Sequence, residues 1–177
     1  RDLNVPRLGR VVAAPGFRFV AAMNPFDAIG TARISAAIYD RVCRLAIDYQ
    51  SATDEETIAV RHAPQLPVGW VAKVVELVRR TRIHHDVRVG SSVRGAIDMC
   101  ALAAALAEVR GSTFDASQVS LDAALASLSG RIRVAEGSRR DAESIIRELW
   151  HDVFGSRDES TDDSGKAIAP NGATPAG

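Results

Sequence analysis

The hydrophobic pattern of the first 50 residues is typical of strands rather than helices. Residues 17–23 are apolar at nearly every position, and the run stops at Asn24. Such near-continuous apolarity predicts a strand that is buried on both faces of a parallel sheet. Residues 43–50 alternate apolar and polar side chains, which predicts a half-buried strand. Earlier, two short apolar runs flank a loop with Pro and Gly within residues 3–14, and this predicts a β-hairpin.

From residue 51 onward, apolar residues recur at helical spacing behind polar capping residues. This pattern predicts five helices, over about 53–62, 67–82, from 91 or 92 onward, about 115–129 and about 138–153. A further short helix is expected between the two predicted strands, from Ser35 to about Val42.

Together these patterns predict an α/β part followed by an all-α part. We expect residues 1–50 to form the α/β part, residues 51–154 a helical domain and residues 155–177 a disordered tail. The tail has a single Ile as its only large apolar residue, so it buries too little apolar surface to offset the entropy of ordering it.

The composition counts against membrane-spanning proteins, disulfide-rich proteins and proteins drawn to nucleic acid by net charge. The 177 residues include 22 Lys and Arg against 22 Asp and Glu, so no net charge draws the chain toward nucleic acid or an anionic membrane. No apolar run approaches the ~20 residues of a membrane helix. Two cysteines, Cys43 and Cys100, are too few for a disulfide scaffold or a metal cluster. We interpret both as reduced core residues of a cytoplasmic protein.

Two adjacent histidines are weaker candidates for chemistry. His84 and His85 would not share a direction on a regular helix or strand, and no third metal ligand is nearby in the sequence. We interpret them as exposed loop residues. The basic run from Arg79 to Arg82 ends a predicted helix, where positive charge is favourable without any function.

The motifs that hold nucleoside triphosphates are absent. A Walker A loop needs Gly-Lys-Ser/Thr so that amides and a Lys surround phosphate, but the one Gly-Lys pair, at Gly165, is followed by Ala167. A Walker B strand needs an apolar run that ends in Asp-Glu, and both Asp-Glu pairs here follow polar residues. The chain alone therefore offers neither a phosphate cradle nor a magnesium site of the expected kind.

Four other segments nevertheless form a recognisable series. They are an apolar strand ending in Asn-Pro (16–25), a Gly-containing loop (30–35), Tyr-Asp-Arg (39–41) and a Ser-x-Arg lead into an Ala-rich helix (90–96). In order and spacing this series resembles the MoxR branch of AAA+ ATPases, including CbbQ- and NorQ-like members. The resemblance covers about residues 5–153.

The resemblance implies roles for particular residues. Asn24 would be sensor 1, the amide that positions the attacking water. Arg41 would be the arginine finger that acts on a neighbouring subunit's nucleotide, with Arg33 and Arg44 as alternatives close in sequence. Arg94 would be sensor 2, which contacts phosphate from the helical domain.

Each of these residues also has a structural interpretation. Asn24 before Pro suits an ordinary turn, and Arg41 could be a surface residue paired with Asp40 or Asp48, worth ~0–1 kcal/mol. Arg94 is less easily explained in this way. A helix dipole disfavours positive charge in the first turn, and a bound phosphate would reverse that preference.

The resemblance implies a fold made of the last strands of a AAA+ core plus its helical lid, with ATP and Mg²⁺ as cofactors. The P-loop and the Walker B strand would precede Arg1, so we expect a fragment that is inactive alone. Full-length relatives form rings, commonly hexamers, that remodel or activate client proteins, often with a von Willebrand factor A partner.

The alternatives are a non-catalytic interaction module that keeps this fold, and a helical nucleic-acid binder. Neutral charge and the lack of a basic stripe on any helix count against the nucleic-acid binder.

Overall fold

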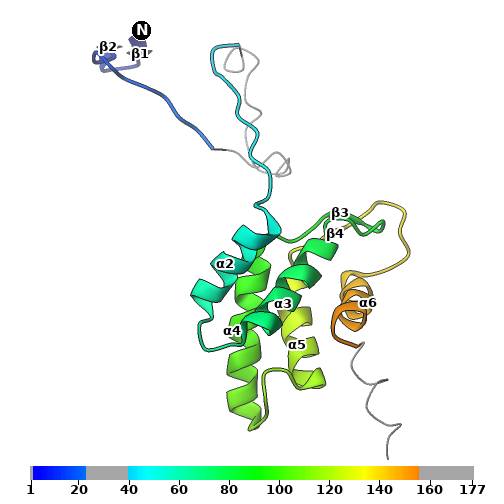
Figure 1. Cartoon of the computed structure of the whole chain (residues 1–177). Coiled ribbons are helices and arrows are strands. Elements are labelled where there is room, and N and C mark those ends of the chain that lie inside the picture. The colour runs from blue at the N-terminus through cyan, green and yellow to red at the C-terminus, as the bar shows by residue number, and fades with distance from the viewer. Residues whose placement is uncertain (1, 23–39, 156–177) are drawn as a thin grey trace, which may run out of the picture. The chain divides into compact units, whose positions relative to one another are not determined.

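A computed structural model describes residues 2–22 and 40–155. These residues fall into two units, one within Arg1–Ile47 and one that begins at Asp48. The described residues contain five α-helices and two small two-stranded antiparallel sheets, so they are mostly helical (Figure 1). The predicted mixture of β-structure with a long helical part is confirmed at this level.

The first unit contains the predicted β-hairpin. Strand β1 (Asp2–Val5) pairs with β2 (Gly9–Val12) in antiparallel register. The Leu8 N–H donates to the Val5 carbonyl at 3.1 Å across the turn. Gly9 has a φ of 76°, a left-handed conformation that glycine adopts without strain.

The two other strands predicted within the first 50 residues do not form among the described residues. Residues 17–22 and 43–50 have no strand assignment, and position 23 lies outside the described residues, as do residues 35–39 of the expected short helix. The apolar side chains are exposed, with Val20 at 90% and Ile47 at 92%. The physical reason is that a strand satisfies its backbone only through a neighbouring strand, and none of the described residues supplies one here. Cys43 is also exposed, which corrects its interpretation as a core residue.

The second unit contains all five predicted helices. They are α2 (Ala52–His62), α3 (Val68–Arg80), α4 (Val93–Arg110), α5 (Ser117–Leu128) and α6 (Ala142–Phe154). Two helices begin at slightly different residues from those predicted, at 52 rather than about 53 and at 142 rather than about 138. Ser51 caps α2 by accepting from the Asp54 N–H at 3.2 Å. Asp141 caps α6 by accepting from the Ser144 N–H at 2.7 Å.

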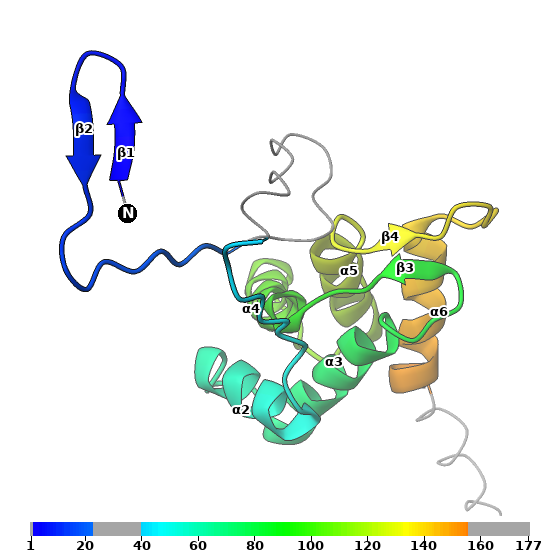
Figure 2. The same cartoon turned by 90° about the horizontal axis from the view of Figure 1, so that it is seen from above.

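A second small sheet lies within the helical part, so that part is not all-α as predicted. Strand β3 (Val87–Val89) pairs antiparallel with β4 (Arg133–Val134), and Figure 2 shows the two side by side near α6. Strands of three and two residues are too short to produce a recognisable alternation of apolar and polar positions.

The core of the helical unit is formed by the apolar faces that the sequence predicts. α3 packs against α2, α4 and α6, and α5 packs against α4 and α6. The predicted stripe of α3, from Val71 to Val78, is fully buried, as is Cys100 on α4. Trp70 packs edge-on to Phe114, with ring centroids 5.3 Å apart. No helix of the described residues is long and apolar enough to cross a membrane.

Candidate phosphate-binding site at the start of α4

The first turn of α4 carries an exposed arginine with no protein partner. Arg94 is the second residue of α4, and within the described part of the chain its guanidinium makes no hydrogen bond or ion pair. Most other arginines of the helical unit pair with a carboxylate, including Arg80, Arg110 and Arg131. Arg94 is therefore available to an anionic ligand.

The backbone beside Arg94 also presents free donors. Ser92 is the N-cap residue, but its hydroxyl does not cap the helix. The Gly95 N–H donates to the Ser92 carbonyl at 2.9 Å, whereas the N–H groups of Val93 and Arg94 have no partner in the described residues. The first turn contains no acidic residue. Free amides, the positive end of the helix dipole and a guanidinium together favour binding of an anion such as phosphate.

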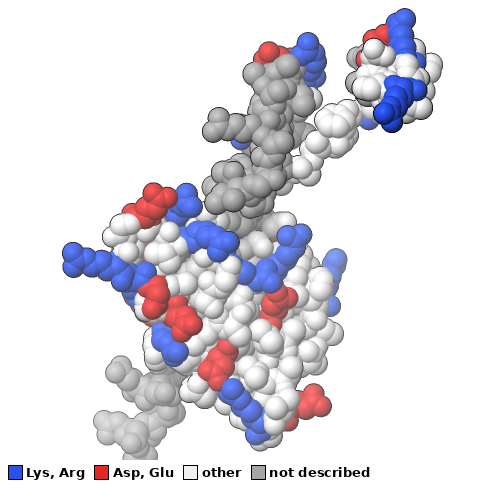
Figure 3. All heavy atoms as spheres, turned by 180° about the vertical axis from the view of Figure 1, so that it is seen from behind, with Lys and Arg blue, Asp and Glu red and all other residues white. Residues whose placement is uncertain are grey.

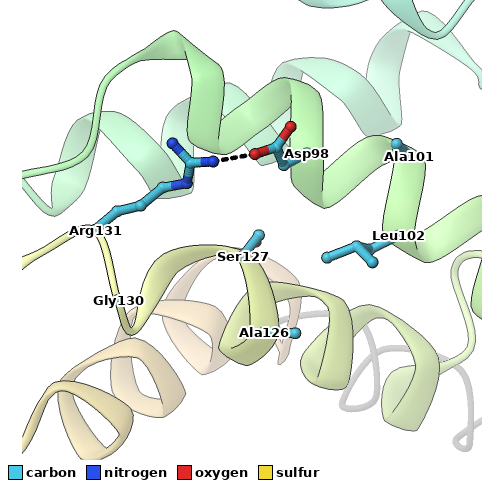
Figure 4. Close-up of a pocket in the computed structure, with 7 residues that line it drawn as sticks. All are labelled: Asp98, Ala101, Leu102, Ala126, Ser127, Gly130 and Arg131. Carbon is cyan, nitrogen blue, oxygen red and sulfur yellow. Dashed lines mark hydrogen bonds and ion pairs between the residues drawn. The ribbon is translucent and has the colours of Figure 1, made fainter.

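Asp98 is the natural partner for Arg94, because residues four apart share a face of a helix. Its carboxylate is instead bonded to the Arg131 guanidinium, which leaves Arg94 unpaired. Figure 4 shows this pair, which lines a hollow between α4 and α5. The volume of the hollow is about 580 Å³. The residues that line it are Asp98, Ala101, Leu102, Ala126, Ser127, Gly130 and Arg131.

The segment just before α4 is fixed against the end of α3. The Ser91 N–H donates to the Thr81 hydroxyl oxygen at 2.9 Å, and both residues are buried. The Arg82 Nε donates to the Ser91 carbonyl at 2.8 Å. A Cβ at Gly90 would lie 2.7 Å from backbone atoms of Arg82, so this close approach requires glycine.

Of the other predicted site residues, two lie outside the described residues and two belong to the first unit. Asn24 and Arg33 lie outside the described residues, and their roles stay predictions. Arg41 and Arg44 are exposed residues of the first unit, while Arg94 belongs to the second.

The histidine pair differs from expectation. His84 and His85 precede β3 in a turn, and their rings stack with centroids 4.5 Å apart and planes 19° apart. The side chain of His84 is only 6% exposed, so the exposed-loop interpretation is wrong for it and holds for His85 at 80%.

The expectation that no third metal ligand is nearby in the sequence is wrong, because it overlooked Asp86, which directly follows His85. With Asp86, these histidines bring three ligand-type atoms within 4.8 Å of one another. Imidazole binds metal through a lone pair in the ring plane, and lone pairs of two nearly parallel stacked rings do not converge on one ion. The His84 Nδ1 already faces the Asp86 N–H at 3.1 Å. Arg140 also occupies the neighbouring acids, donating to Glu148 at 2.5 Å and lowering its pKa. This arrangement does not fit a metal centre.

Sequence reasoning missed the importance of Arg79 and Arg82, which it treated as part of an ordinary basic run. Both lie against Glu55 of α2, which is fully buried. The one available signal was the spacing of Glu55, which precedes the buried Ala59 by one helical turn and so shares its face.

Acidic and basic side chains are interspersed over the helical unit on the face drawn in Figure 3, without a broad field of one sign. No protein-family model, curated protein or solved structure matches the chain. The likeness to MoxR-type ATPases therefore rests on the quoted motifs, and any function must be argued from the residues.

Proposed function

We propose that this chain is part of a MoxR-type AAA+ ATPase that couples ATP binding and hydrolysis to the remodelling or activation of client proteins. The observation that carries the proposal is the first turn of α4, where Arg94 and two free backbone amides form an anion site without a protein anion. The site lies where the sequence motif of sensor 2 places a phosphate contact.

In this proposal the chain supplies three groups to a shared active site. Asn24 orients the attacking water, and Arg41, or else Arg33 or Arg44, neutralises transition-state charge on a neighbouring subunit's ATP. Arg94 contacts phosphate from within its own chain. The sequence has no Walker motifs, so the phosphate cradle and the Mg²⁺ ligands would come from a further segment.

The proposed assembly is a cytoplasmic ring, a hexamer by family resemblance, with a von Willebrand factor A protein as a possible partner. An arginine that acts across a subunit interface makes hydrolysis depend on assembly, because binding and transition-state stabilisation are then on different chains. Arg94 acts differently, because it would stabilise phosphate in the same chain that binds it.

A mixing experiment tests these roles on the chain joined to the P-loop half of a MoxR-type protein. Arg41→Ala should abolish hydrolysis and leave ATP binding almost intact. Subunits that lack the P-loop Lys but carry Arg41 should restore turnover when mixed with Arg41→Ala subunits. An intact Arg94 on a partner should not rescue Arg94→Ala. The measurement is steady-state phosphate release across mixing ratios.

No recovery at any ratio, with rings verified by sedimentation, would reject Arg41 as the residue acting across the interface and direct attention to Arg33 or Arg44. Full hydrolysis by Arg94→Ala would contradict the proposal for α4. No hydrolysis by the unaltered joined chain, in rings verified by sedimentation, would favour the alternative of a non-catalytic interaction module.

A further inference from the structure

A buried carboxylate lies at the junction of α2 and α3. Glu55 is 0% exposed, and both of its oxygens are paired. Arg82 donates to Oε1 at 2.7 Å and to Oε2 at 3.2 Å, and Arg79 donates to Oε2 at 2.9 Å. A charged carboxylate in a protein interior is tolerated only with such partners, so this geometry is tightly determined.

Arg82 uses its remaining side to hold the chain before α4. Its Nε donates to the Ser91 carbonyl at 2.8 Å while its two terminal nitrogens face Glu55. Its side chain is only 10% exposed. One rigid guanidinium therefore links a fixed carboxylate on α2 to a backbone group three residues before Arg94.

The residues that lead into α2 rest on the same pair of arginines. The Tyr49 ring lies 3.8 Å from the Arg82 guanidinium carbon, and its hydroxyl is 3.4 Å from the Gly90 carbonyl. The Gln50 carbonyl accepts from Arg79 at 3.2 Å. The cluster of Glu55, Arg79 and Arg82 thus joins three separate stretches of chain.

We propose that Arg82, oriented by Glu55, is a positioning residue for the phosphate site at the start of α4. The free amides of the first turn favour an anion only if they point in one direction, and Arg82 fixes the segment that sets this direction. Lysine would not replace it, because one ammonium group lacks the planar fork that reaches Glu55 and Ser91 together. The phosphate ligand in this inference rests on the proposed function.

The test compares Arg82→Lys with Arg80→Lys in the full chain. Arg80 is a matched control because it is the last residue of α3, two positions before Arg82, and pairs with a carboxylate, Glu76, at the surface. Two quantities are measured by NMR: the exchange rate of the Ser91 amide, which bonds to Thr81, and the amide shifts of residues 93–95 on titration with inorganic tripolyphosphate. Amides in the core of α6 report any global loss of stability.

Arg82→Lys should speed Ser91 exchange about tenfold more than exchange in α6, and it should weaken tripolyphosphate binding by a similar factor. Arg80→Lys should change neither quantity. If Arg82→Lys does not fold, Glu55→Gln takes its place as the test variant and Glu76→Gln serves as its control. Gln keeps the shape of Glu but removes its charge.

The two ways of failing are distinguishable. One failure concerns only Arg82. If the unaltered chain clearly binds tripolyphosphate, and Arg82→Lys changes neither Ser91 exchange nor binding, the proposed role of Arg82 is wrong and the phosphate site stands. No shift at residues 93–95 in the unaltered chain would reject the phosphate site, and with it both the proposed function and this inference.

Discussion

The two units differ in how far their apolar side chains are exposed. In the helical unit the apolar stripes of α3 and α6 are buried in one core, while in the first unit Phe19, Val20, Leu45 and Ile47 are exposed. A helix satisfies its backbone within its own segment and needs partners only for one face. An extended apolar segment needs neighbours both for its backbone and for its side chains. A hydrophobic pattern therefore predicts a helix more directly than it predicts a strand.

This difference also bears on the site. The start of α4 is held by a buried network within one unit, from Glu55 through Arg82 to Ser91. Such a site can be tested in this chain as it is. The roles proposed for Asn24 and Arg41 depend on residues of the first unit and on neighbouring subunits, so they need the joined protein.

The largest expected contrast between the units is in thiol reactivity. Cys43 is exposed, whereas Cys100 is buried, and burial raises the pKa of the Cys100 thiol to about 12. A thiol reagent should modify Cys43 at least ~1,000-fold faster, because Cys100 reacts only when the helical unit opens. Labelling is followed by mass spectrometry, with Cys43→Ser and Cys100→Ser assigning the two rates. Comparable rates would show that the units are not packed as differently as described.

Matched Leu→Ala variants extend the contrast to stability. Leu77 is fully buried in α3, and Leu45 is 87% exposed. Leu77→Ala should lower the free energy of unfolding of the helical unit by ~2–5 kcal/mol, because it leaves a cavity. Leu45→Ala should change it by less than ~0.5 kcal/mol. Urea unfolding followed by fluorescence suits the comparison, since Trp70 and Trp150 both lie in the helical unit. An equal loss in both variants would contradict the division.

The helices could be predicted from the sequence because each has a regular apolar face and a polar start. Their ends were predicted less well. The helix predicted over about 53–62 begins instead at Ala52, behind Ser51, because several neighbouring Ser, Thr and Asp residues can cap and only local geometry selects one. The short strands β3 and β4 gave no periodic signal.

The site was only partly predictable. Arg94 was singled out because residues 90–96 resemble a sensor-2 segment, with some support from the unfavourable position of a positive charge in the first turn of a helix. The role of Arg82 was missed because it depends on Glu55, 27 residues away, and that contact exists only in the folded unit. The strands predicted at residues 17–22 and 43–50 do not form in the described part of the chain. Here a local pattern predicted an element that needs a neighbouring strand, which the pattern itself does not supply.

The smallest expected effect is a pH dependence confined to the helical unit. The Ser144 N–H holds the pKa of Asp141 below its usual value, so this cap stabilises the fold above a pH of about 4 and is lost as the pH falls through the lowered pKa. Asp141→Asn keeps a capping oxygen that does not titrate. Between about pH 5 and pH 3 the unaltered chain should therefore lose more thermal stability than this variant. Asp115→Asn, at a residue without hydrogen bonds in the described chain, is the control. Parallel curves for the unaltered chain and Asp141→Asn would count against the cap.

The central claim is that the first turn of α4 binds phosphate, and the most direct test is an NMR titration of the full chain with tripolyphosphate at constant ionic strength. The account predicts saturable shifts of the Val93, Arg94 and Gly95 amides in the millimolar range, because this chain lacks a P-loop. Arg94→Gln should abolish them, whereas Arg61→Gln, which removes another exposed arginine without a partner in the described residues, should leave them intact. Shifts that persist in Arg94→Gln, or that are absent from the unaltered chain, would contradict the claim.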